Sequence, residues 1–229
     1  MQWIHDYDLF LFDFDGLLVN TEELHYRAYK EMCRSFGADL DWSFQEYAEI
    51  AHVSSQGLRE EIYKKFPELA AKHPRWDDLY KEKTRNYLNL LNQGNVQLMP
   101  GVADFLHEIV KRHKKTCVVT NSSRQMVEAI IDSHPALQLI DSWMARQDYD
   151  KPKPDPECYL RALSQFSADA DRAIGFEDSP RGLQALLGAK ADAVLITELE
   201  YPSMEDLIDE RTKRFYSFHE LLQSDWLNK

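Results

Sequence analysis

The 229-residue chain lacks a basic excess, a long apolar segment and a regular set of cysteines. Its 27 Lys and Arg residues face 39 Asp and Glu residues, a formal net charge of −12. Nucleic acids and anionic membranes attract basic surfaces, so the composition disfavours both as partners. No apolar run approaches the ~20 residues that cross a bilayer, and the start has no signal-peptide pattern. The three cysteines are too scattered for a disulfide or zinc framework. We therefore expect a globular, cytoplasmic protein, with a monomer as the default state.

Hydrophobic residues are plentiful, at 44% of the chain with 12% aromatic, which is enough for a real core. Short apolar runs without polar alternation are typical of buried parallel strands. Such runs occupy 8–12, 116–120, 172–176 and 193–196, and a further short segment lies near 139–145. Helical periodicity predicts helices at 102–112, 123–133, 156–167, 180–188 and 217–224. Strands that alternate with helices in this way predict a parallel sheet covered on both faces.

The segment after the first strand breaks this alternation, because residues 20–96 contain helical patterns only. A helix follows Thr21, and others are expected at 43–51, 55–66 and 75–92, with breaks at glycine and proline. We therefore predict an α/β protein with a Rossmann-like, doubly wound parallel sheet formed by 1–19 and 97–229. The inserted residues 20–96 form an all-helical cap domain.

Polar side chains follow several predicted strands at the point where each strand ends. Ligands bind beyond the carboxyl ends of parallel strands, so these side chains are expected to converge. They are Asp13, Asp15, Thr120, Asn121, Glu177 and Asp178. Lys151, in a loop before a predicted helix, is expected to join them. Four carboxylates so close together would repel one another unless a hard cation lay among them. Oxygen ligands without a nearby thiol or imidazole favour Mg²⁺ over zinc.

Four segments of the chain carry a family resemblance. The run Asp13-Phe14-Asp15-Gly16-Leu17 resembles the first motif of the haloacid dehalogenase-like superfamily. Val118-Val119-Thr120-Asn121-Ser122 is similar to the second motif and Lys151-Pro152-Lys153-Pro154-Asp155 to the third. Gly175-Phe176-Glu177-Asp178-Ser179 is similar to the fourth. The helical insertion between the first two resembles the subfamily that holds β-phosphoglucomutase and many small sugar-phosphate phosphatases.

The resemblance implies a role for each motif residue. Asp13 would be the nucleophile that forms an aspartyl-phosphate, and Asp15 the general acid and base. Thr120 would bind a phosphoryl oxygen, and Lys151 would offset negative charge. Mg²⁺ would be held by Asp13, the backbone carbonyl of Asp15, Glu177 and Asp178. An Asp two residues after the nucleophile separates phosphatases and phosphomutases from dehalogenases.

Other residues are candidates for contact with phosphate or substrate: Gly16, Asn121, His25 and Ser55. Gly16 lies among the residues after Asp13, whose amides could bind the transferring group. His25 lies one helical turn beyond Thr21 and is either a site residue or a structural histidine. Ser55 stands where the mutases carry an arginine for a second phosphate. Arg59 follows one turn later, and this departure weakens the mutase interpretation.

The leading functional hypothesis is a Mg²⁺-dependent phosphatase of a small phosphorylated metabolite, most simply a sugar phosphate, whose cap closes over the substrate. A β-phosphoglucomutase-like phosphomutase is the alternative. A catalytically silent binding module is disfavoured, because the chain keeps the carboxylates and the lysine of the motifs.

Overall fold

The chain folds into two compact units, and each unit is described by itself. The structure is a computed structural model, which describes residues 2–94, 96–168, 172–201, 204 and 206–224. The first unit contains Met1–Asn20 and Gln97–Lys229, and the second contains Thr21–Val96. The sequence patterns place the corresponding boundaries after residues 19 and 96.

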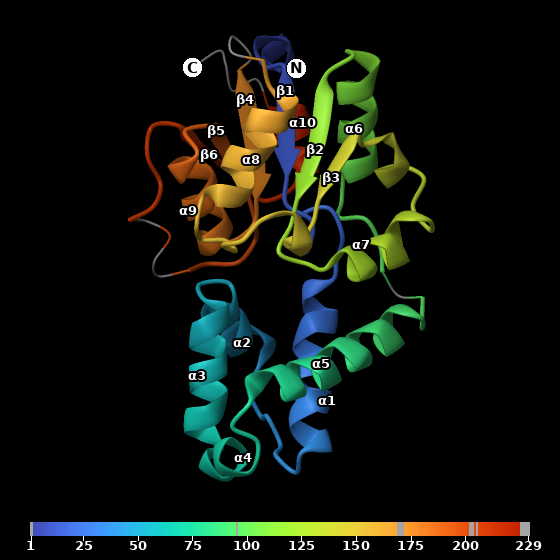
Figure 1. Cartoon of the computed structure of the whole chain (residues 1–229). Helices are drawn as coiled ribbons and strands as arrows, with labels where there is room; N and C mark the ends of the chain where they lie inside the picture. Colours follow the sequence, from blue (N-terminus) through green and yellow to red (C-terminus); the bar gives the residue numbers. More distant parts are fainter. Residues whose placement is uncertain (1, 95, 169–171, 202–203, 205, 225–229) are drawn as a thin grey trace. The chain divides into compact units, whose positions relative to one another are not determined.

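The first unit is built on a parallel sheet. Its strands are β1 Leu9–Phe12, β2 Lys115–Val119, β3 Ser142–Met144, β4 Ala173–Glu177, β5 Asp192–Ile196 and β6 Thr212–Phe215. They lie in the order β3-β2-β1-β4-β5-β6 (Figure 1). The strand order switches at β1: β2 and β3 follow on one side of it, and β4 to β6 lie on the other side. Such a switch point places polar residues from both halves of a sheet beside one another.

The helices of this unit begin at recognisable signals. They are α6 Val102–Lys111, α7 Arg124–Ile131, α8 Glu157–Phe166, α9 Pro180–Gly188 and α10 Phe218–Gln223. Several start after a serine whose hydroxyl accepts a backbone N–H of the first turn, as Ser123 does for α7 and Ser179 for α9. A polar residue in front of an apolar periodic segment therefore marks these helix starts in the sequence.

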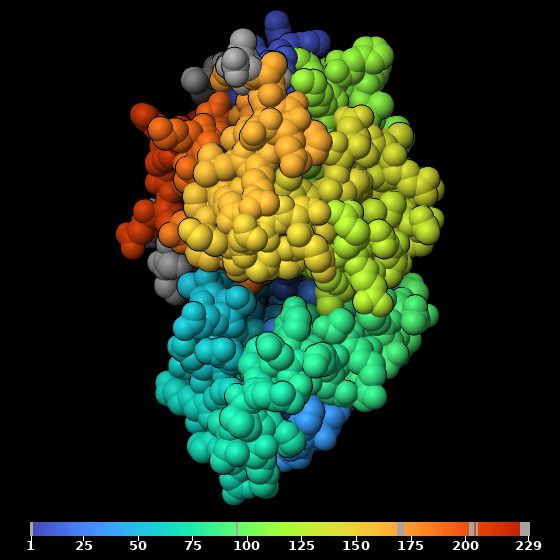
Figure 2. Space-filling model, viewed as in Figure 1, coloured from blue at the N-terminus to red at the C-terminus, as the bar shows by residue number. Residues whose placement is uncertain are grey.

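Successive residues of β1 point to opposite faces of the sheet, and helices cover both faces. Leu9 and Leu11 pack with residues of α8 and α9, which lie toward the viewer in Figure 2. On the opposite face the rings of Phe12 and Phe176 stack on each other, and both meet Phe105 of α6 edge-on. Apolar residues at every position of β1 are therefore explained by burial on both sides.

Helices are the regular elements of the second unit, as predicted, and its described residues contain no strand. It contains α1 Glu22–Ser35, α2 Phe44–Ala51, α3 Ser55–Lys65, α4 Pro67–Lys72 and α5 Trp76–Leu91. A capping box starts α2, where Ser43 and Glu46 exchange side-chain and backbone hydrogen bonds. Its core is separate and rich in aromatic residues, including Tyr29 and Tyr47.

Two elements depart from the sequence predictions. The break predicted near Pro67 is present, because α3 ends at Lys65. The pattern does not predict the short helix α4, which begins at Pro67, where the missing N–H of proline costs nothing. The edge strand β6 reads Thr-Lys-Arg-Phe and is half exposed, so it lacks the apolar run that would predict it. None of the described helices is long and apolar enough to cross a membrane.

Candidate active site

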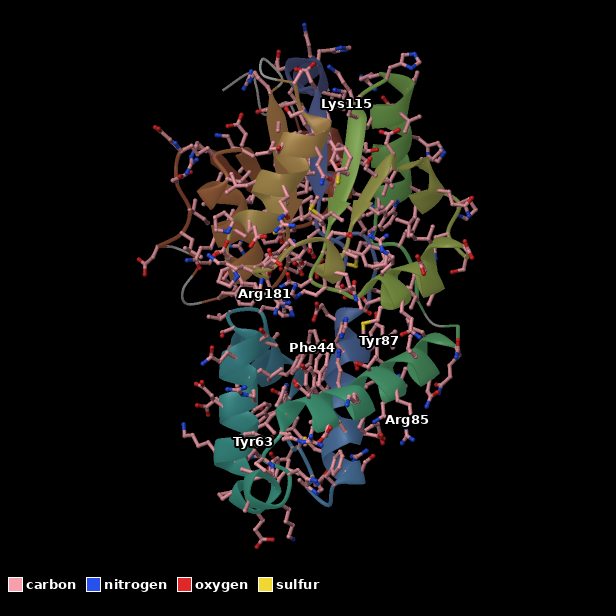
Figure 3. All side chains as sticks on the ribbon, in the orientation of Figure 1. Phe44, Tyr63, Arg85, Tyr87, Lys115 and Arg181 are labelled. Carbon is pink, nitrogen blue, oxygen red and sulfur yellow. The ribbon has the colours of Figure 1, made fainter. Side chains whose placement is uncertain are left out.

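The carboxylates of the first and fourth motifs meet at the carboxyl ends of β1 and β4. Phe12 pairs with Phe176, and the Asp13 N–H donates to the Phe176 carbonyl at 3.0 Å. Asp13 and Glu177 therefore lie side by side although they are far apart in sequence. Asp13, Glu177 and Asp178 each offer a carboxylate oxygen within 4.8 Å of the others. This cluster lies at the strand ends opposite to Lys115, which marks the start of β2 in Figure 3.

A buried lysine joins this cluster, and it is Lys153. Its ammonium nitrogen lies 2.6 Å from Asp13 Oδ1 and 2.6 Å from Glu177 Oε1. It also contacts the Val119 carbonyl at 2.7 Å and the Tyr159 hydroxyl oxygen at 3.0 Å. Only 2% of the Lys153 side chain is exposed. One ammonium group thus links the end of β1 to the end of β4.

The placement of Lys151 in the site is wrong. Its side chain is 70% exposed and lies 3.8 Å from Asp155 in a surface ion pair. The sequence Lys151-Pro152-Lys153-Pro154-Asp155-Pro156 contains the pattern Lys-Pro-x-Pro twice, in overlapping registers. The fold buries the lysine of the second copy, because only that residue reaches the ends of β1 and β4.

The loop that presents Lys153 is held by side chains on either side of it. The Glu157 carboxylate accepts hydrogen bonds from the backbone N–H groups of Asp150 and Lys151, both at 3.0 Å. The Asn121 Oδ1 atom accepts from the Lys153 N–H at 3.1 Å and from the Tyr149 hydroxyl at 2.8 Å. Asn121, predicted to bind phosphate, is therefore engaged with the backbone that carries the lysine.

The Asp15 carboxylate points toward the end of β2. Its Oδ2 atom accepts a hydrogen bond from the Ser122 hydroxyl at 2.5 Å and contacts Thr120 Oγ1 at 3.4 Å. The Ser122 N–H in turn donates to Thr120 Oγ1 at 3.0 Å. The structure thus brings Thr120 beside Asp15, and adds Ser122, for which the motif alone predicts no role.

Gly16 has a conformational part at this site. Its φ of 80° lies in the left-handed region that favours glycine. Its N–H donates to the Val19 carbonyl at 2.9 Å, which closes the loop that follows Asp15. The Gly16 amide, predicted to bind phosphate, is therefore already engaged within this turn.

Burial and charge act against each other in the cluster. Burial raises the pKa of Asp13 to about 7; the Lys153 ammonium opposes this rise, while Glu177 and Asp15 add to it. Burial disfavours the charged form of Lys153, but the Asp13 and Glu177 carboxylates outweigh it and raise the Lys153 pKa well above its usual value. One positive charge thus faces an excess of carboxylates.

The donor set of the cluster fits a divalent cation. Glu177 Oε2 is buried and has no hydrogen-bond partner among the residues that the structure describes. It lies against Gly182, where an added Cβ would stand 1.8 Å from Oε2. An unsatisfied buried carboxylate oxygen beside Asp13 and Asp178 matches the all-oxygen ligands that Mg²⁺ prefers. The Asp15 side chain, by contrast, is directed to Ser122.

The remaining predicted residues belong to the second unit. His25 stacks on Tyr87 of α5, with ring centres 4.2 Å apart, and its Nδ1 lies 2.5 Å from the ammonium nitrogen of Lys83; Figure 3 labels Tyr87. Ser55 is the exposed first residue of α3, and Arg59 is partly exposed on that helix. Their contact with substrate stays a prediction.

The sequence patterns do not predict three residues that lie in the site: Lys153 and Tyr159 beside the carboxylate cluster, and Ser122 beside Asp15. The first had a visible signal, since the repeated Lys-Pro-x-Pro pattern offers two registers. Tyr159 had none, because a tyrosine in an amphipathic helix looks like any core residue. Ser122 follows Asn121 in the second motif, but only the turn around Thr120 aims its hydroxyl at Asp15.

Comparison with known proteins places this geometry in a family. Residues 10–196 match the model of the haloacid dehalogenase-like hydrolases. The chain belongs to the haloacid dehalogenase-like hydrolase family. Protein CbbY of Cereibacter sphaeroides is 33% identical over 189 residues, which cover 78% of this chain and 79% of that protein. The match confirms the family resemblance of the four motifs.

Two further relatives bear on the chemistry. Validoxylamine A 7'-phosphate phosphatase of Streptomyces hygroscopicus subsp. limoneus is 28% identical over 78% of this chain and 80% of its own length. A crystal structure of a CbbY mutant from Rhodobacter sphaeroides in complex with xylulose-(1,5)bisphosphate is 29% identical, with a TM-score of 0.75. It covers 94% of this chain and 96% of its own. The predicted sheet with an inserted helical domain is thereby confirmed.

Proposed function

We propose that this chain is a Mg²⁺-dependent phosphatase that hydrolyses a small phosphorylated metabolite through an aspartyl-phosphate intermediate. The observation that carries the proposal is the Lys153 ammonium group, which lies 2.6 Å from both Asp13 and Glu177 at the edge of the sheet. A nucleophilic carboxylate must approach a negatively charged phosphate ester, and positive charge at this point lowers the repulsion between them.

Asp13 is the proposed nucleophile. Its Oδ1 atom contacts Lys153, which restricts rotation of the carboxylate and orients the group toward an incoming phosphorus atom. Attack forms the bond between the Asp13 oxygen and phosphorus as the bond from phosphorus to the ester oxygen breaks. Water then attacks the aspartyl-phosphate, which releases inorganic phosphate and restores Asp13.

Asp15 is the proposed general acid and base. It would give a proton to the departing ester oxygen in the first step and take one from the attacking water in the second. The hydrogen bond from the Ser122 hydroxyl at 2.5 Å orients this carboxylate at the end of β2. Thr120, beside it, is the proposed ligand of a phosphoryl oxygen, and Lys153 replaces Lys151 in the proposed charge-neutralising role.

Asp13, Glu177 and Asp178 would hold Mg²⁺, together with the backbone carbonyl of Asp15. The bound ion would offset the negative charge of the phosphoryl group and of the surrounding carboxylates. The buried Glu177 Oε2 supports this assignment, because a cation would satisfy an oxygen that accepts no hydrogen bond among the described residues.

We further propose a sugar phosphate as the substrate. The support is the xylulose-(1,5)bisphosphate bound to the CbbY mutant from Rhodobacter sphaeroides, and a relative from Thermotoga maritima that is named as a phosphorylated carbohydrates phosphatase. The unit Thr21–Val96 is the proposed specificity domain, with His25 and Ser55 as its candidate substrate contacts.

Phosphate release from a panel of pentose and hexose mono- and bisphosphates, nucleotides and an aryl phosphate tests the proposal. The wild type is expected to release phosphate in the presence of Mg²⁺, and this release should stop when EDTA removes the metal. Asp13→Asn keeps the shape of the side chain and should lower kcat by at least about 10⁴-fold.

The same assays separate the alternatives. Interconversion of β-glucose 1-phosphate and glucose 6-phosphate without net phosphate release would replace the phosphatase by a mutase. Folded protein that is silent in both assays would refute an enzymatic function.

A further inference from the structure

We propose that Tyr159 is a positioning residue of the site, whose hydroxyl group fixes the Glu177 carboxylate in the orientation that binds the cation. The inference rests on the proposed function in taking Mg²⁺ as that cation. It assigns a role to a residue that belongs to none of the four motifs and lies in the middle of the core.

The chemistry of the three groups determines which atom donates. Tyr159 lies in the first turn of α8 and is fully buried, with its hydroxyl in hydrogen-bond contact with Glu177 Oε1 and 3.0 Å from the Lys153 nitrogen. A carboxylate only accepts and an ammonium only donates. The Tyr159 O–H therefore donates to Glu177, and its oxygen accepts from Lys153.

Tyr159 contacts both Lys153 and Glu177, and the number of N–H groups on Lys153 shows that Glu177 depends more on this contact. Three N–H groups face four acceptors: Asp13, Glu177 and the Val119 carbonyl at 2.6–2.7 Å, and Tyr159 at 3.0 Å. The Tyr159 contact is the longest, so Lys153 loses little without it. Glu177 Oε1, however, loses one of its two donors. The hydroxyl group therefore acts mainly on Glu177.

The two oxygens of Glu177 have different surroundings. Oε1 is bound by Lys153 and Tyr159, whereas buried Oε2 has no partner among the described residues. Two donors on Oε1 hinder rotation of the carboxylate and keep Oε2 in place. Partners that orient a metal ligand typically contribute 10–100-fold to metal affinity.

A single substitution separates the hydroxyl group from the ring. The Tyr159 ring packs among core residues such as Leu11 and lies 4.8 Å from the Lys153 ammonium nitrogen. Tyr159→Phe keeps both contacts and removes one oxygen. Tyr7→Phe is the matched control: Tyr7 is also buried and donates to a carboxylate, Asp192 Oδ2 at 2.7 Å, at the opposite end of the strands.

The test is calorimetric titration of the metal-free proteins with Mg²⁺, without substrate. Tyr159→Phe should raise the Mg²⁺ dissociation constant about 10–100-fold, and Tyr7→Phe should leave it within about twofold. Unfolding midpoints in EDTA verify that both variants fold, with a shift of no more than about 4 °C expected for Tyr159→Phe. At saturating Mg²⁺ the KM should stay within about twofold of the wild type, because Tyr159 does not bind substrate.

A double variant tests whether Tyr159 acts through Glu177. Once Glu177→Gln has removed the carboxylate, adding Tyr159→Phe should change the Mg²⁺ dissociation constant by less than about threefold. If Tyr159→Phe alone does not fold, the double variant still allows the measurement, because the uncharged amide introduced by Glu177→Gln does not need a second hydrogen-bond donor as the Glu177 carboxylate does. An effect of Tyr159→Phe that persists undiminished in the Glu177→Gln background would overturn the role assigned to Glu177.

Three further outcomes would overturn the inference: an unchanged Mg²⁺ affinity in Tyr159→Phe, an equal loss in Tyr7→Phe, and a wild type that binds no Mg²⁺. A wild type that binds Mg²⁺ but hydrolyses no phosphate ester would refute the proposed function alone, because the titration needs no substrate.

Discussion

Among the described residues, each of the two units buries one lysine, and the surroundings of these two lysines differ. In the first unit the Lys153 nitrogen lies 2.6 Å from two carboxylates, Asp13 and Glu177. In the second unit the Lys83 nitrogen lies 2.5 Å from His25 Nδ1 and 5.1–5.5 Å from the ring centres of Tyr29, Tyr80 and Tyr87. A buried ammonium can thus be surrounded by full negative charges or by the faces of aromatic rings. Only the first arrangement also supplies a nucleophile and cation ligands.

The largest effect is expected from Lys153→Met, because it leaves two buried carboxylates without their shared partner. The free energy of unfolding should fall by about 3–5 kcal/mol, and kcat by about 10²–10³-fold. Urea unfolding and phosphate release measure the two quantities. Lys151→Met is the matched control: its side chain is exposed, so stability should stay within about 0.5 kcal/mol. Equal effects of the two substitutions would contradict the assignment of the charge-neutralising role to Lys153.

Gly182→Ala should displace Glu177 and so disturb the same cluster from its other side. The new Cβ would lie 1.8 Å from Oε2 and 2.2 Å from the carboxylate carbon. We expect a loss of about 1–3 kcal/mol of stability and a Mg²⁺ affinity weakened at least about 10-fold. Gly57→Ala, where the nearest atom is 3.3 Å away in the second unit, is the control and should leave Mg²⁺ binding unchanged. Tight Mg²⁺ binding by Gly182→Ala would argue against Glu177 as a ligand.

The burial of Asp13 beside other carboxylates should make the stability of the metal-free protein depend on pH. Burial raises the Asp13 pKa from 3.8 to about 7, so in this range the folded state binds a proton that the unfolded state lacks. Protonated Asp13 contributes to the free energy of unfolding. This contribution is complete below the pKa of Asp13 in the unfolded state and is lost as the pH rises to about 7. The difference in unfolding free energy between wild type and Asp13→Asn should therefore decrease over this range in EDTA. A difference that increases with pH would contradict the raised pKa.

The smallest effect is expected from Lys83→Met. The Lys83 ammonium lies against an imidazole and three aromatic rings, and the substitution removes these contacts. The loss of stability should stay under about 2 kcal/mol, less than for Lys153→Met in the same urea titration. A loss as large as that of Lys153→Met would mean that Lys83 neutralises charge as well.

Most elements of the fold were predictable because each depends on local pattern. The apolar runs around β1 and β5 are buried on both faces, and the helical block after Asn20 carries no strand pattern. The exceptions have local causes. The edge strand β6 is only half buried, and a short unpredicted helix, α4, follows directly after the predicted break near Pro67.

The sequence by itself determined the residue types of the site, because the four motifs place carboxylates and a lysine after strands that must end at one edge of a sheet. The tertiary structure decided which copy of each group acts. Lys151 and Lys153 occupy equivalent positions of overlapping patterns, and only burial separates them. Asn121 is turned to the Lys153 backbone, and Tyr159 meets Glu177 across the core. These pairings join residues 32 and 18 positions apart, and Lys153 meets Asp13 over a separation of 140 positions. No local pattern encodes the close approach of such distant groups.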